Sequence, residues 1–414
     1  MPQEATDFPT AITFARTGAA EFLGSDGLIQ SVAEDVAAFA YDATGAALGV
    51  VIEGATAHLL ANTSDPHTIL TTLTNATLDD DAAVAPDGTT TAVALIEDTT
   101  ASAAHYLFGT FTSSPSISAG ANRNWSFFVK PNGRTKIYAA LYDASAQSNF
   151  ILTTLDLSAG TAIGTVGGAG VLVAAPAPVS YPSGWWRVSL IGTPNPASSG
   201  ALRPRVQLLS DGGSINYTGN GTSGVYLWGH NIHAGASVRS FCAMAGTTRT
   251  RGADLLSVNN LGTIFGATGG TFKMEFIVPG AAPAGANRTI MHMDDGSTDN
   301  SYDLRIDAGT RNVACVVRAG GAEVADVVAG VAVDGSRNVV AFSYTTDGFR
   351  ISLNGAAAVS DISGAVPTGL TAMYLGASDD AGSDPLDGIL YGAERRRSSM
   401  GAADVAAFSA YPVE

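Results

Sequence analysis

The chain has 414 residues and a formal net charge of −16, with 21 basic residues against 37 acidic ones. This balance lacks the net positive footprint that binding to nucleic acid or to an anionic membrane surface requires. Only 14% of the residues are charged, 46% are hydrophobic and 48 are Gly, a composition that favours many short strands over long solvated helices. The length predicts two or three domains.

Neither a disulfide framework nor a targeting segment is expected. Cys242 and Cys315 stand in apolar, strand-like contexts and predict two buried free thiols. The N-terminal stretch MPQEATDFPTAITF has neither the basic nor the apolar region of a signal peptide, and no run approaches 18 apolar residues. We therefore expect a chain made in the cytoplasm without a signal peptide and without membrane insertion.

Residues 1–67 form the first predicted part. The stretches GSDGL and DATGA are hairpin signals, in which Gly27 and Gly45 supply a positive φ. Such a short meander cannot hold a hydrophobic core by itself. We expect an N-terminal hairpin segment that packs on a neighbouring domain or on another copy of the chain.

Residues 68–245 predict an all-β unit, a sandwich or jelly roll. Its predicted strands are bounded by Pro, Gly and Asn at the spacing of such folds. The Gly-, Ala- and Pro-rich stretch 161–184 is expected to be a loop with one short strand. The predicted strands are RNWSFFVKP, TKIYAALYDA, NFILTTLDL, GWWRVSLIGT, RPRVQLLSD and GVYLWGHNI.

Residues 246–261 have no clear period and are expected to be a linker, and residues 262–414 predict a second all-β unit. Near the end, Ser398 or Ser399 is a candidate N-cap, and Val405 and Phe408 have helical spacing. The expected fold class is all-β: two tandem β-sandwich (jelly-roll) domains after a short hairpin segment, with one short C-terminal helix.

Aromatic residues concentrate in two predicted strands. Trp185 and Trp186 are adjacent, so they point to opposite faces, whereas Tyr226 and Trp228 share a face. Large aromatics usually fill sandwich interiors, and we expect this of Trp228 and of one member of the pair. The outward member is then a candidate sugar platform or subunit contact. With the polar side chain of Asn220, the candidate ligand-binding residues are Trp185, Trp186, Tyr226, Trp228 and Asn220.

No catalytic constellation is found, and the chain is not expected to be an enzyme. A glycosidase needs two carboxylates across its substrate, but no Glu is followed two residues later by Asp, as in the Glu-x-Asp strand typical of concanavalin-like hydrolases. A Gly-x-Ser-x-Gly elbow and a His-Glu-x-x-His spacing are also missing. His230 and His233 would face opposite sides of a strand and are expected to be surface or interface histidines.

One weak metal signal remains, in the stretch DDGSTDNSYD. Asp295, Ser297 and Asp299 alternate as the ligands of a calcium loop would, but Asn300 and Ile306 stand where an EF-hand has Gly and Glu. No cofactor is expected apart from calcium, for which the candidate ligands are Asp295, Asp299 and Asp303.

Three parts of the chain resemble known protein families. The opening ITFARTGAAEFLGSDGLIQS, followed by GVVIEGATAHLLANTSD, resembles the N-terminal segment of phage and gene-transfer-agent head-spike or tail-fibre proteins. The stretches SFFVKP, GWWRVSL and YTGNGTSGVYLWGHNIHAGASVRSF resemble the carbohydrate-binding-module-like jelly roll of that family. The stretches FSYTTDGFRISLNGAAAV and LDGILYGAERRRSSMGAADVAAFSA are similar to concanavalin A-like or laminin G-like sandwiches.

The resemblance implies a virion structural protein, a head spike or tail fibre that adsorbs to host surface polysaccharide. It implies manufacture in the host cytoplasm, attachment to other capsid or tail proteins through the N-terminal segment, and a homo-oligomer, either a trimer or a pentamer. Two alternatives stay open: a purely architectural capsid decoration or baseplate protein, and a polysaccharide depolymerase. A laminin G-like domain also implies calcium at a loop rim.

Overall fold

A computed structural model describes residues 12–42, 44–60, 63, 66–68, 70–110, 119–198, 201–244, 246, 250–259, 261, 268–278 and 286–410. The all-β fold class is confirmed: strands dominate and one α-helix, α1 (Ala402–Ser409), lies near the C-terminus. Within these ranges no helix is both long and apolar enough to cross a membrane.

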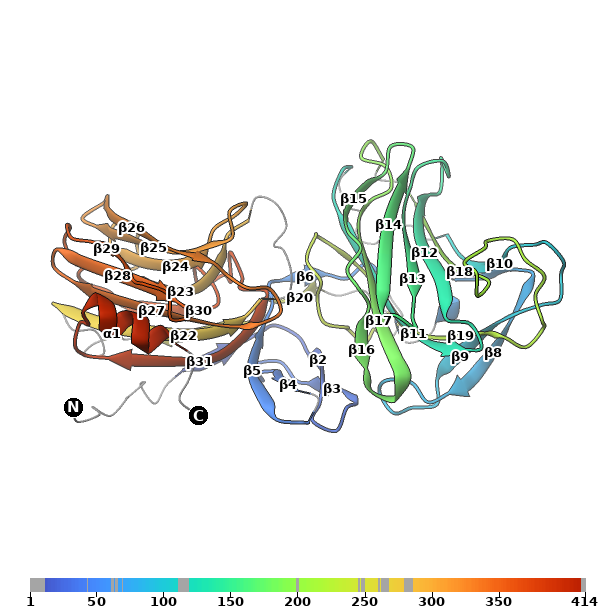
Figure 1. Cartoon of the computed structure of the whole chain (residues 1–414), viewed down its shortest axis with the longest axis horizontal. Helices are drawn as coiled ribbons and strands as arrows, with labels where there is room; N and C mark the ends of the chain where they lie inside the picture. Colours follow the sequence, from blue (N-terminus) through green and yellow to red (C-terminus); the bar gives the residue numbers. More distant parts are fainter. Residues whose placement is uncertain are drawn as a thin grey trace. The chain divides into compact units, whose positions relative to one another are not determined.

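The chain divides into two compact units. One contains residues 1–19, 32–55 and 252–414, and is called here the terminal sandwich because it holds both ends of the chain. The other contains residues 20–31 and 56–251, and is called the central sandwich. Figure 1 shows the last strands of the terminal sandwich in orange and red and most strands of the central sandwich in green.

The terminal sandwich has two antiparallel seven-stranded sheets, which enclose a core that includes Phe272, Tyr302 and Phe342. In order, the first sheet is β1 (Thr13–Ala15), β21 (Leu255–Asn259), β30 (Ala372–Leu375), β23 (Arg288–Asp294), β24 (Ser301–Ile306), β25 (Asn312–Ala319) and β26 (Ala322–Val331). The second is β29 (Val359–Asp361), β28 (Gly348–Leu353), β27 (Arg337–Thr345), β22 (Gly269–Ile277), β31 (Gly388–Arg396), β5 (Ala47–Ile52) and β4 (Phe39–Tyr41).

The central sandwich also has two antiparallel sheets, around a core that includes Trp125, Phe127 and Leu190. Its first sheet is β14 (Thr161–Gly167), β13 (Phe150–Asp156), β12 (Lys136–Asp143), β18 (Leu202–Leu208), β10 (His105–Phe108) and β7 (Thr72–Thr74). Its second is β15 (Val171–Ala174), β17 (Trp185–Thr193), β11 (Arg123–Asn132), β19 (Gly224–Ala234), β9 (Ala92–Glu97) and β8 (Ala76–Ala83), with β16 (Val179–Tyr181) beside β17.

Four short strands and two 3-10 turns lie outside the four large sheets. The strands form two-stranded sheets, β2 (Ala20–Leu23) with β3 (Ile29–Val32) and β6 (Thr56–Ala57) with β20 (Thr250–Arg251). The turns are η1 (Pro66–Thr68) and η2 (Pro182–Gly184). Gly27 and Gly45 have the positive φ that the hairpin signals predict, 78° and 84°.

The N-terminal residues do not form a separate part, in contrast to the predicted segment 1–67. β1 pairs with β21, so the predicted linker also holds a strand, and β5 pairs with β31. Gly49 makes the second pairing possible: its φ is 141° and a Cβ there would lie 2.2 Å from the carbonyl oxygen of Leu390. The early strands therefore supply edges to sheets whose other strands come from the end of the chain.

Two further local predictions are corrected. The stretch 161–184 holds three strands, β14, β15 and β16, because alternating small and β-branched residues pair along β13 and β17. The N-cap of α1 is Gly401, without a side-chain cap, in place of Ser398 or Ser399. The helix docks through buried Val405 and through Ser409, whose Oγ lies 2.7 Å from Oγ of Ser352.

Candidate functional site

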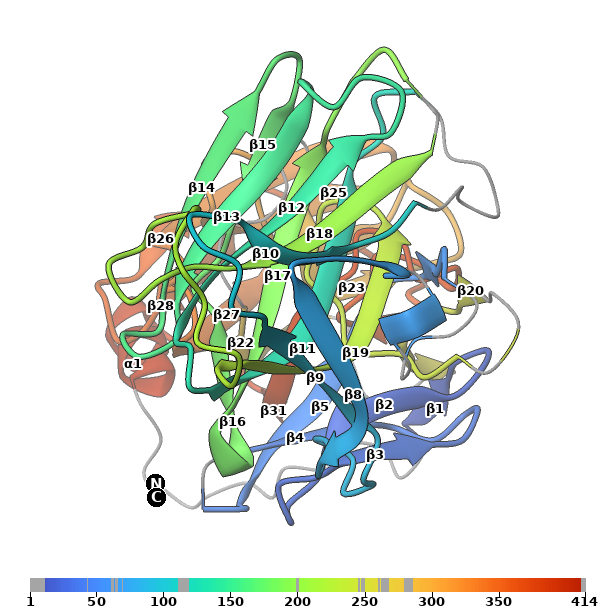
Figure 2. The same cartoon turned by 90° about the vertical axis from the view of Figure 1, so that its right-hand side faces the viewer.

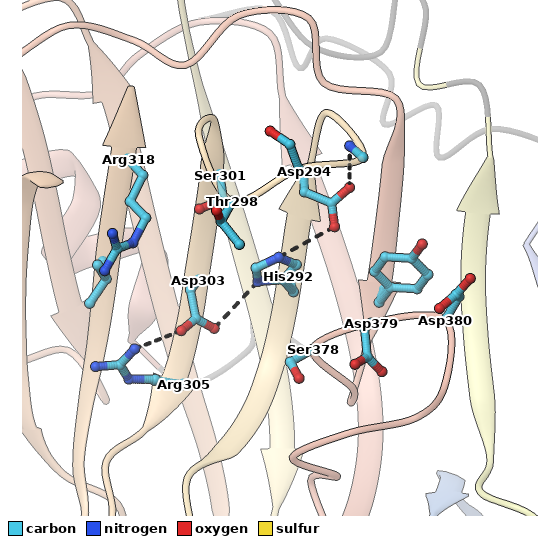
Figure 3. Close-up of a pocket in the computed structure, with 14 residues that line it drawn as sticks. His292, Asp294, Thr298, Ser301, Asp303, Arg305, Arg318, Ser378, Asp379 and Asp380 are labelled. Carbon is cyan, nitrogen blue, oxygen red and sulfur yellow. Dashed lines mark hydrogen bonds and ion pairs between the residues drawn. The ribbon is translucent and has the colours of Figure 1, made fainter. Parts of the chain in front are cut away.

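A depression of about 530 Å³ lies on the outer face of the first sheet of the terminal sandwich. Four neighbouring strands, β30, β23, β24 and β25, form its floor, and the loops after β23 and β30 contribute to its walls (Figure 3). The residues that line it are His292, Asp294, Gly296, Ser297, Thr298, Ser301, Asp303, Arg305, Val316, Arg318, Tyr374, Ser378, Asp379 and Asp380.

Strand alternation places these polar side chains together. In β24, Tyr302 and Leu304 point into the core, so Asp303 and Arg305 point outward. In β23, Met291 and Met293 lie in the core, and His292 points outward between them. Because His292 pairs with Asp303 on one side and with Tyr374 on the other, the three side chains lie in one row across the sheet.

A chain of charged contacts fixes this row, as Figure 3 shows. Asp303 accepts a hydrogen bond of 2.7 Å from Nη1 of Arg305, whose Nε donates to Asp307 at 2.8 Å. His292 lies between two carboxylates, with Nδ1 3.6 Å from Oδ1 of Asp303 and Nε2 3.4 Å from Oδ2 of Asp294. These side chains support one another, so their geometry exists before any ligand binds.

The two carboxyl groups of the depression with shifted pKa values are both shifted downward. Burial disfavours the charged form of Asp303, but His292 and Arg305 outweigh burial and lower its pKa. Burial likewise opposes ionisation of Asp379, whose pKa is lowered by hydrogen bonds from Ser383 and the loop backbone. Both groups are therefore carboxylates, hydrogen-bond acceptors only, at neutral pH.

Tyr374 supplies a half-buried aromatic ring beside these charges. Burial raises the pKa of its phenol, and the negative charges of Asp294, Asp380 and Asp379 raise it further. The phenol therefore stays protonated and remains a hydrogen-bond donor. The depression thus combines acceptors, donors and one ring on rigid strands.

The three predicted calcium ligands do not converge. Asp295 bonds within its own loop, to the backbone N and Oγ of Ser297 and to Nδ2 of Asn300. Asp299 takes part in the same loop through its backbone N, which donates to Oγ of Ser297 at 3.1 Å. Asp303 instead points toward His292. Across the described ranges no group of three or more His, Cys, Asp or Glu side chains has a metal-binding arrangement.

The adjacent tryptophans separate as strand alternation predicts. Trp186 is half-buried and packs against the core between the two sheets of the central sandwich. Trp185 points to the outer face, yet it is only 1% exposed. It lies in a second cluster with Phe128, Trp228 and Phe241, and its Nε1 donates to the carbonyl oxygen of Val84 at 3.2 Å. The outward ring is therefore covered.

The other predicted ligand residues have structural contacts. Trp228 and Tyr226 share a face, as predicted, but this is the outer face of the sheet, where Trp228 is 1% exposed. The exposed Asn220 lies in a turn where its Oδ1 accepts from the backbone N of Thr222 and Ser223. The structure brings Trp185, Tyr226 and Trp228 into one cluster, whereas Asn220 bonds within its own turn.

His230 and His233 are buried, which corrects the expectation of surface histidines. His230 stacks on Phe127 with ring centroids 5.0 Å apart and accepts from Nε1 of Trp125 at 3.3 Å. Burial lowers the pKa of each imidazole to about 3. Both rings are therefore neutral core groups. Cys242 and Cys315 are buried free thiols, as predicted.

Sequence reasoning missed His292, Arg305 and Tyr374. Their signal is present in RTIMHMDDG and SYDLRIDA, where polar residues alternate with core residues. In isolation each such residue is equally typical of a solvated strand face. The depression becomes visible only when β23 and β30 pair side by side, although Asp294 and Ala372, which face each other there, are 78 positions apart in the sequence.

Comparison with known proteins gives structural likeness alone. No family model matches the chain, and no curated protein does. Among solved structures it is similar to the CBM40 module of the Ruminococcus gnavus IT-sialidase bound to alpha2,3 sialyllactose, with 17% identity, a TM-score of 0.31, and coverage of 36% of this chain and 85% of that one. It is also similar to domains LG4-5 of the mouse laminin alpha1 chain, with 10% identity, a TM-score of 0.25, and coverage of 73% and 88%.

Proposed function

We propose that the chain is a non-catalytic glycan-binding protein, and that the depression on β30, β23, β24 and β25 holds a hydroxyl-rich saccharide without acidic groups. The observation that carries this proposal is the row of mutually supported polar side chains beside the ring of Tyr374, in an open depression of about 530 Å³. Sugar hydroxyls donate to carboxylates and accept from guanidinium groups, and the apolar face of a sugar packs on an aromatic ring.

Charge selects among saccharides. The lining has four carboxylates, those of Asp294, Asp303, Asp379 and Asp380, against two guanidinium groups, so its aspartates and arginines carry a formal charge of −2. An acidic saccharide would meet like charge here, and repulsion of this kind acts as a specificity device. Neutral or amino-bearing sugars are the matching class.

The pKa directions support binding without turnover. Glycoside hydrolysis needs a carboxylic acid that stays protonated to donate a proton, opposite a second carboxylate. The pKa values of Asp303 and Asp379 are shifted in the opposite direction, which suits acceptance of hydroxyl protons.

The test compares four proteins on gels that contain dextran, mannan or galactan. The proteins are the wild type, Tyr374→Ala, Asp303→Asn and the control Tyr391→Ala, which lies in the other sheet on β31. We expect the wild type and the control to be retarded by at least one polymer and the two depression variants to lose about tenfold in affinity. Equal retardation of all four would place binding elsewhere, and release of reducing ends would favour a depolymerase.

At a finer level we propose that this binding serves adsorption of a virion, in line with the resemblance to head-spike and tail-fibre proteins. Weak sites of this kind become useful through copy number, because multivalent display raises avidity without new contacts. A homo-oligomer, trimer or pentamer, is the corresponding assembly. Immunogold labelling tests whether particles carry the chain, and sedimentation of the purified chain tests its oligomeric state. A monomeric chain that antibodies do not detect on particles would contradict this proposal.

A second candidate, an architectural part of an assembly, is favoured by a different observation. Apolar side chains are exposed on three edge strands of the central sandwich: Ile163 on β14 is 68% exposed, Val171 on β15 48% and Val179 on β16 57%. Exposed apolar side chains on sheet edges are candidates for contacts between proteins. Val179→Lys, which charges this edge, should prevent assembly if the second candidate is correct.

A further inference from the structure

The outer face of the six-stranded sheet of the central sandwich carries two arginines on its inner strand β18. Arg203 and Arg205 are two residues apart, so both point away from the core, which contains Val206 and Leu208 of the same strand. The neighbouring strands β10 and β12 lie on either side of β18 (Figure 2). They place Tyr106 and Phe108 on one flank of the arginines and Tyr142 on the other.

Aromatic rings pack against both guanidinium groups. Cζ of Arg203 lies 3.9 Å from the ring centroid of Phe108, and Cζ of Arg205 lies 4.0 Å from that of Tyr106 and 5.2 Å from that of Tyr142. Stacking of this kind contacts the face of a guanidinium group, whereas its N–H donors lie in its plane. The rings thus hold the two guanidinium groups side by side on β18.

Most of those donors have no acceptor. Within the described residues Arg203 makes no hydrogen bond, Arg205 donates to the hydroxyl of Tyr138 at 3.1 Å, and Nε of each is buried without a hydrogen-bond partner. No carboxylate of those residues forms an ion pair with either arginine, although Arg16, Arg134 and Arg305 each have one. Two half-buried guanidinium groups without a counter-ion among the described residues therefore lie two positions apart on one strand, in a chain of charge −16.

We propose that this face, Arg203 and Arg205 with Tyr106, Phe108 and Tyr142, binds a carboxylated saccharide. The guanidinium fork matches a carboxylate in charge and geometry, and a partly desolvated cation gains from an anionic partner. The rings beside it offer apolar surface to the sugar. Nucleic acid, the other polyanion, is disfavoured because the overall charge repels it and two arginines neutralise few phosphates. The site lies in the central sandwich and does not depend on the depression described above.

The experiment measures binding of the full chain by titration calorimetry to two acidic polymers, polygalacturonate and polysialic acid. Each is paired with its carboxyl-reduced form, which keeps the sugar but removes the charge. The variants are Arg203→Gln, which breaks no described hydrogen bond, and Arg203→Lys, which keeps the charge but loses the planar fork. Controls are Arg397→Gln, an exposed arginine of the terminal sandwich outside the depression, and Tyr374→Ala.

We expect the wild type to bind at least one acidic polymer. Tyr374→Ala, in which the depression is disabled, should keep this binding and should bind neither reduced form. Arg203→Gln should weaken this binding about tenfold or more, Arg203→Lys should weaken it less, and neither control should change it. Which polymer binds identifies the source of the carboxylate, a hexuronic or a sialic acid.

Three outcomes would overturn the proposal. If Tyr374→Ala bound a reduced polymer as tightly as the acidic one, the carboxylate would not be the recognised group. If the wild type bound neither acidic polymer, carboxylated saccharides would be excluded as ligands. Loss with Tyr374→Ala but not with Arg203→Gln would move acid binding to the depression. A sedimentation coefficient that changes in Arg203→Gln, without sugar binding by the wild type, would make this face a contact between copies.

Discussion

Arg16 and Asp254, 238 positions apart, form an ion pair of 3.2 Å with side chains that are 0% and 1% exposed. Arg16 also donates to the carbonyl oxygens of Gly18, Ala33 and Val36, and the second oxygen of Asp254 accepts from the backbone N of Glu53. Residues before and after the central sandwich are thereby joined in one buried network of the terminal sandwich.

Because this ion pair is buried, the stability of the terminal sandwich should depend strongly on Arg16. Arg16→Met removes the cation that pairs with buried Asp254 and the hydrogen bonds that Arg16 donates to three backbone carbonyls, and it should lower the free energy of unfolding of this unit by about 3–5 kcal/mol. Urea unfolding followed by fluorescence measures the change. Arg318→Met is the control, since its pair with Glu323 is about half exposed and should contribute less than about 1 kcal/mol. Equal effects of the two variants would refute the assigned role of Arg16.

Replacing each of the two adjacent tryptophans should lower the free energy of unfolding by different amounts. Trp185 is 1% exposed among rings from four segments, so Trp185→Ala leaves a cavity and should cost about 3–5 kcal/mol in the central sandwich. Trp186→Ala removes a half-buried ring and should cost less. Chemical unfolding of both variants checks the order. A Trp185→Ala variant that is as stable as the wild type would mean that its cover is absent in solution.

Buried histidines predict acid sensitivity of the central sandwich. The pKa values of His230 and His233 are about 3 when folded, against 6.5 in the ordinary state. Between pH 6.5 and 3 the unfolded chain binds protons that the folded chain does not, so stability falls as pH falls, by about 1.4 kcal/mol per pH unit for each histidine. His230→Phe removes one of these protons, so it should reduce the slope of unfolding free energy against pH by about 1.4 kcal/mol per pH unit. An unchanged slope would show that His230 titrates normally.

Calcium removal should leave the terminal sandwich unchanged. Both oxygens of Asp295 bond within their own loop, and Asp303 is paired with Arg305, so neither is free to join a calcium shell. Melting temperatures in EDTA and in millimolar calcium should agree. A rise of several degrees in calcium that Asp295→Asn abolishes would restore the calcium site as first expected.

Strand positions could be predicted from the sequence because their signals are local. The stretches RNWSFFVKP and SYDLRIDA alternate or end at Pro and Gly, and both form strands, β11 and β24. The pairing of β1 with β21 and of β5 with β31 could not be predicted, since short strands acquire their partners from distant sequence. The predicted segment 1–67 treated these strands as local hairpins for that reason.

For the candidate site too, local features could be predicted from the sequence and long-range contacts could not. Alternation showed that Trp185 and Trp186 face opposite ways, but not that Phe241, more than 50 residues later, packs in the cluster that covers the outward ring. Similarly, His292, Asp303 and Tyr374 come from three strands, and their row depends on a register that no single strand encodes. Local patterns therefore identify faces, whereas long-range pairing decides which faces are open.

The central claim, that the depression beside Tyr374 binds glycans without acidic groups, is tested most directly on an array of immobilised neutral, amino-bearing and acidic oligosaccharides. Wild-type protein and Tyr374→Ala, each verified as folded, are applied at equal concentration. The account predicts that the wild type binds a set of neutral or amino-bearing glycans and that Tyr374→Ala loses this set. A wild type that binds no such glycan, or a variant that keeps them all, would contradict it.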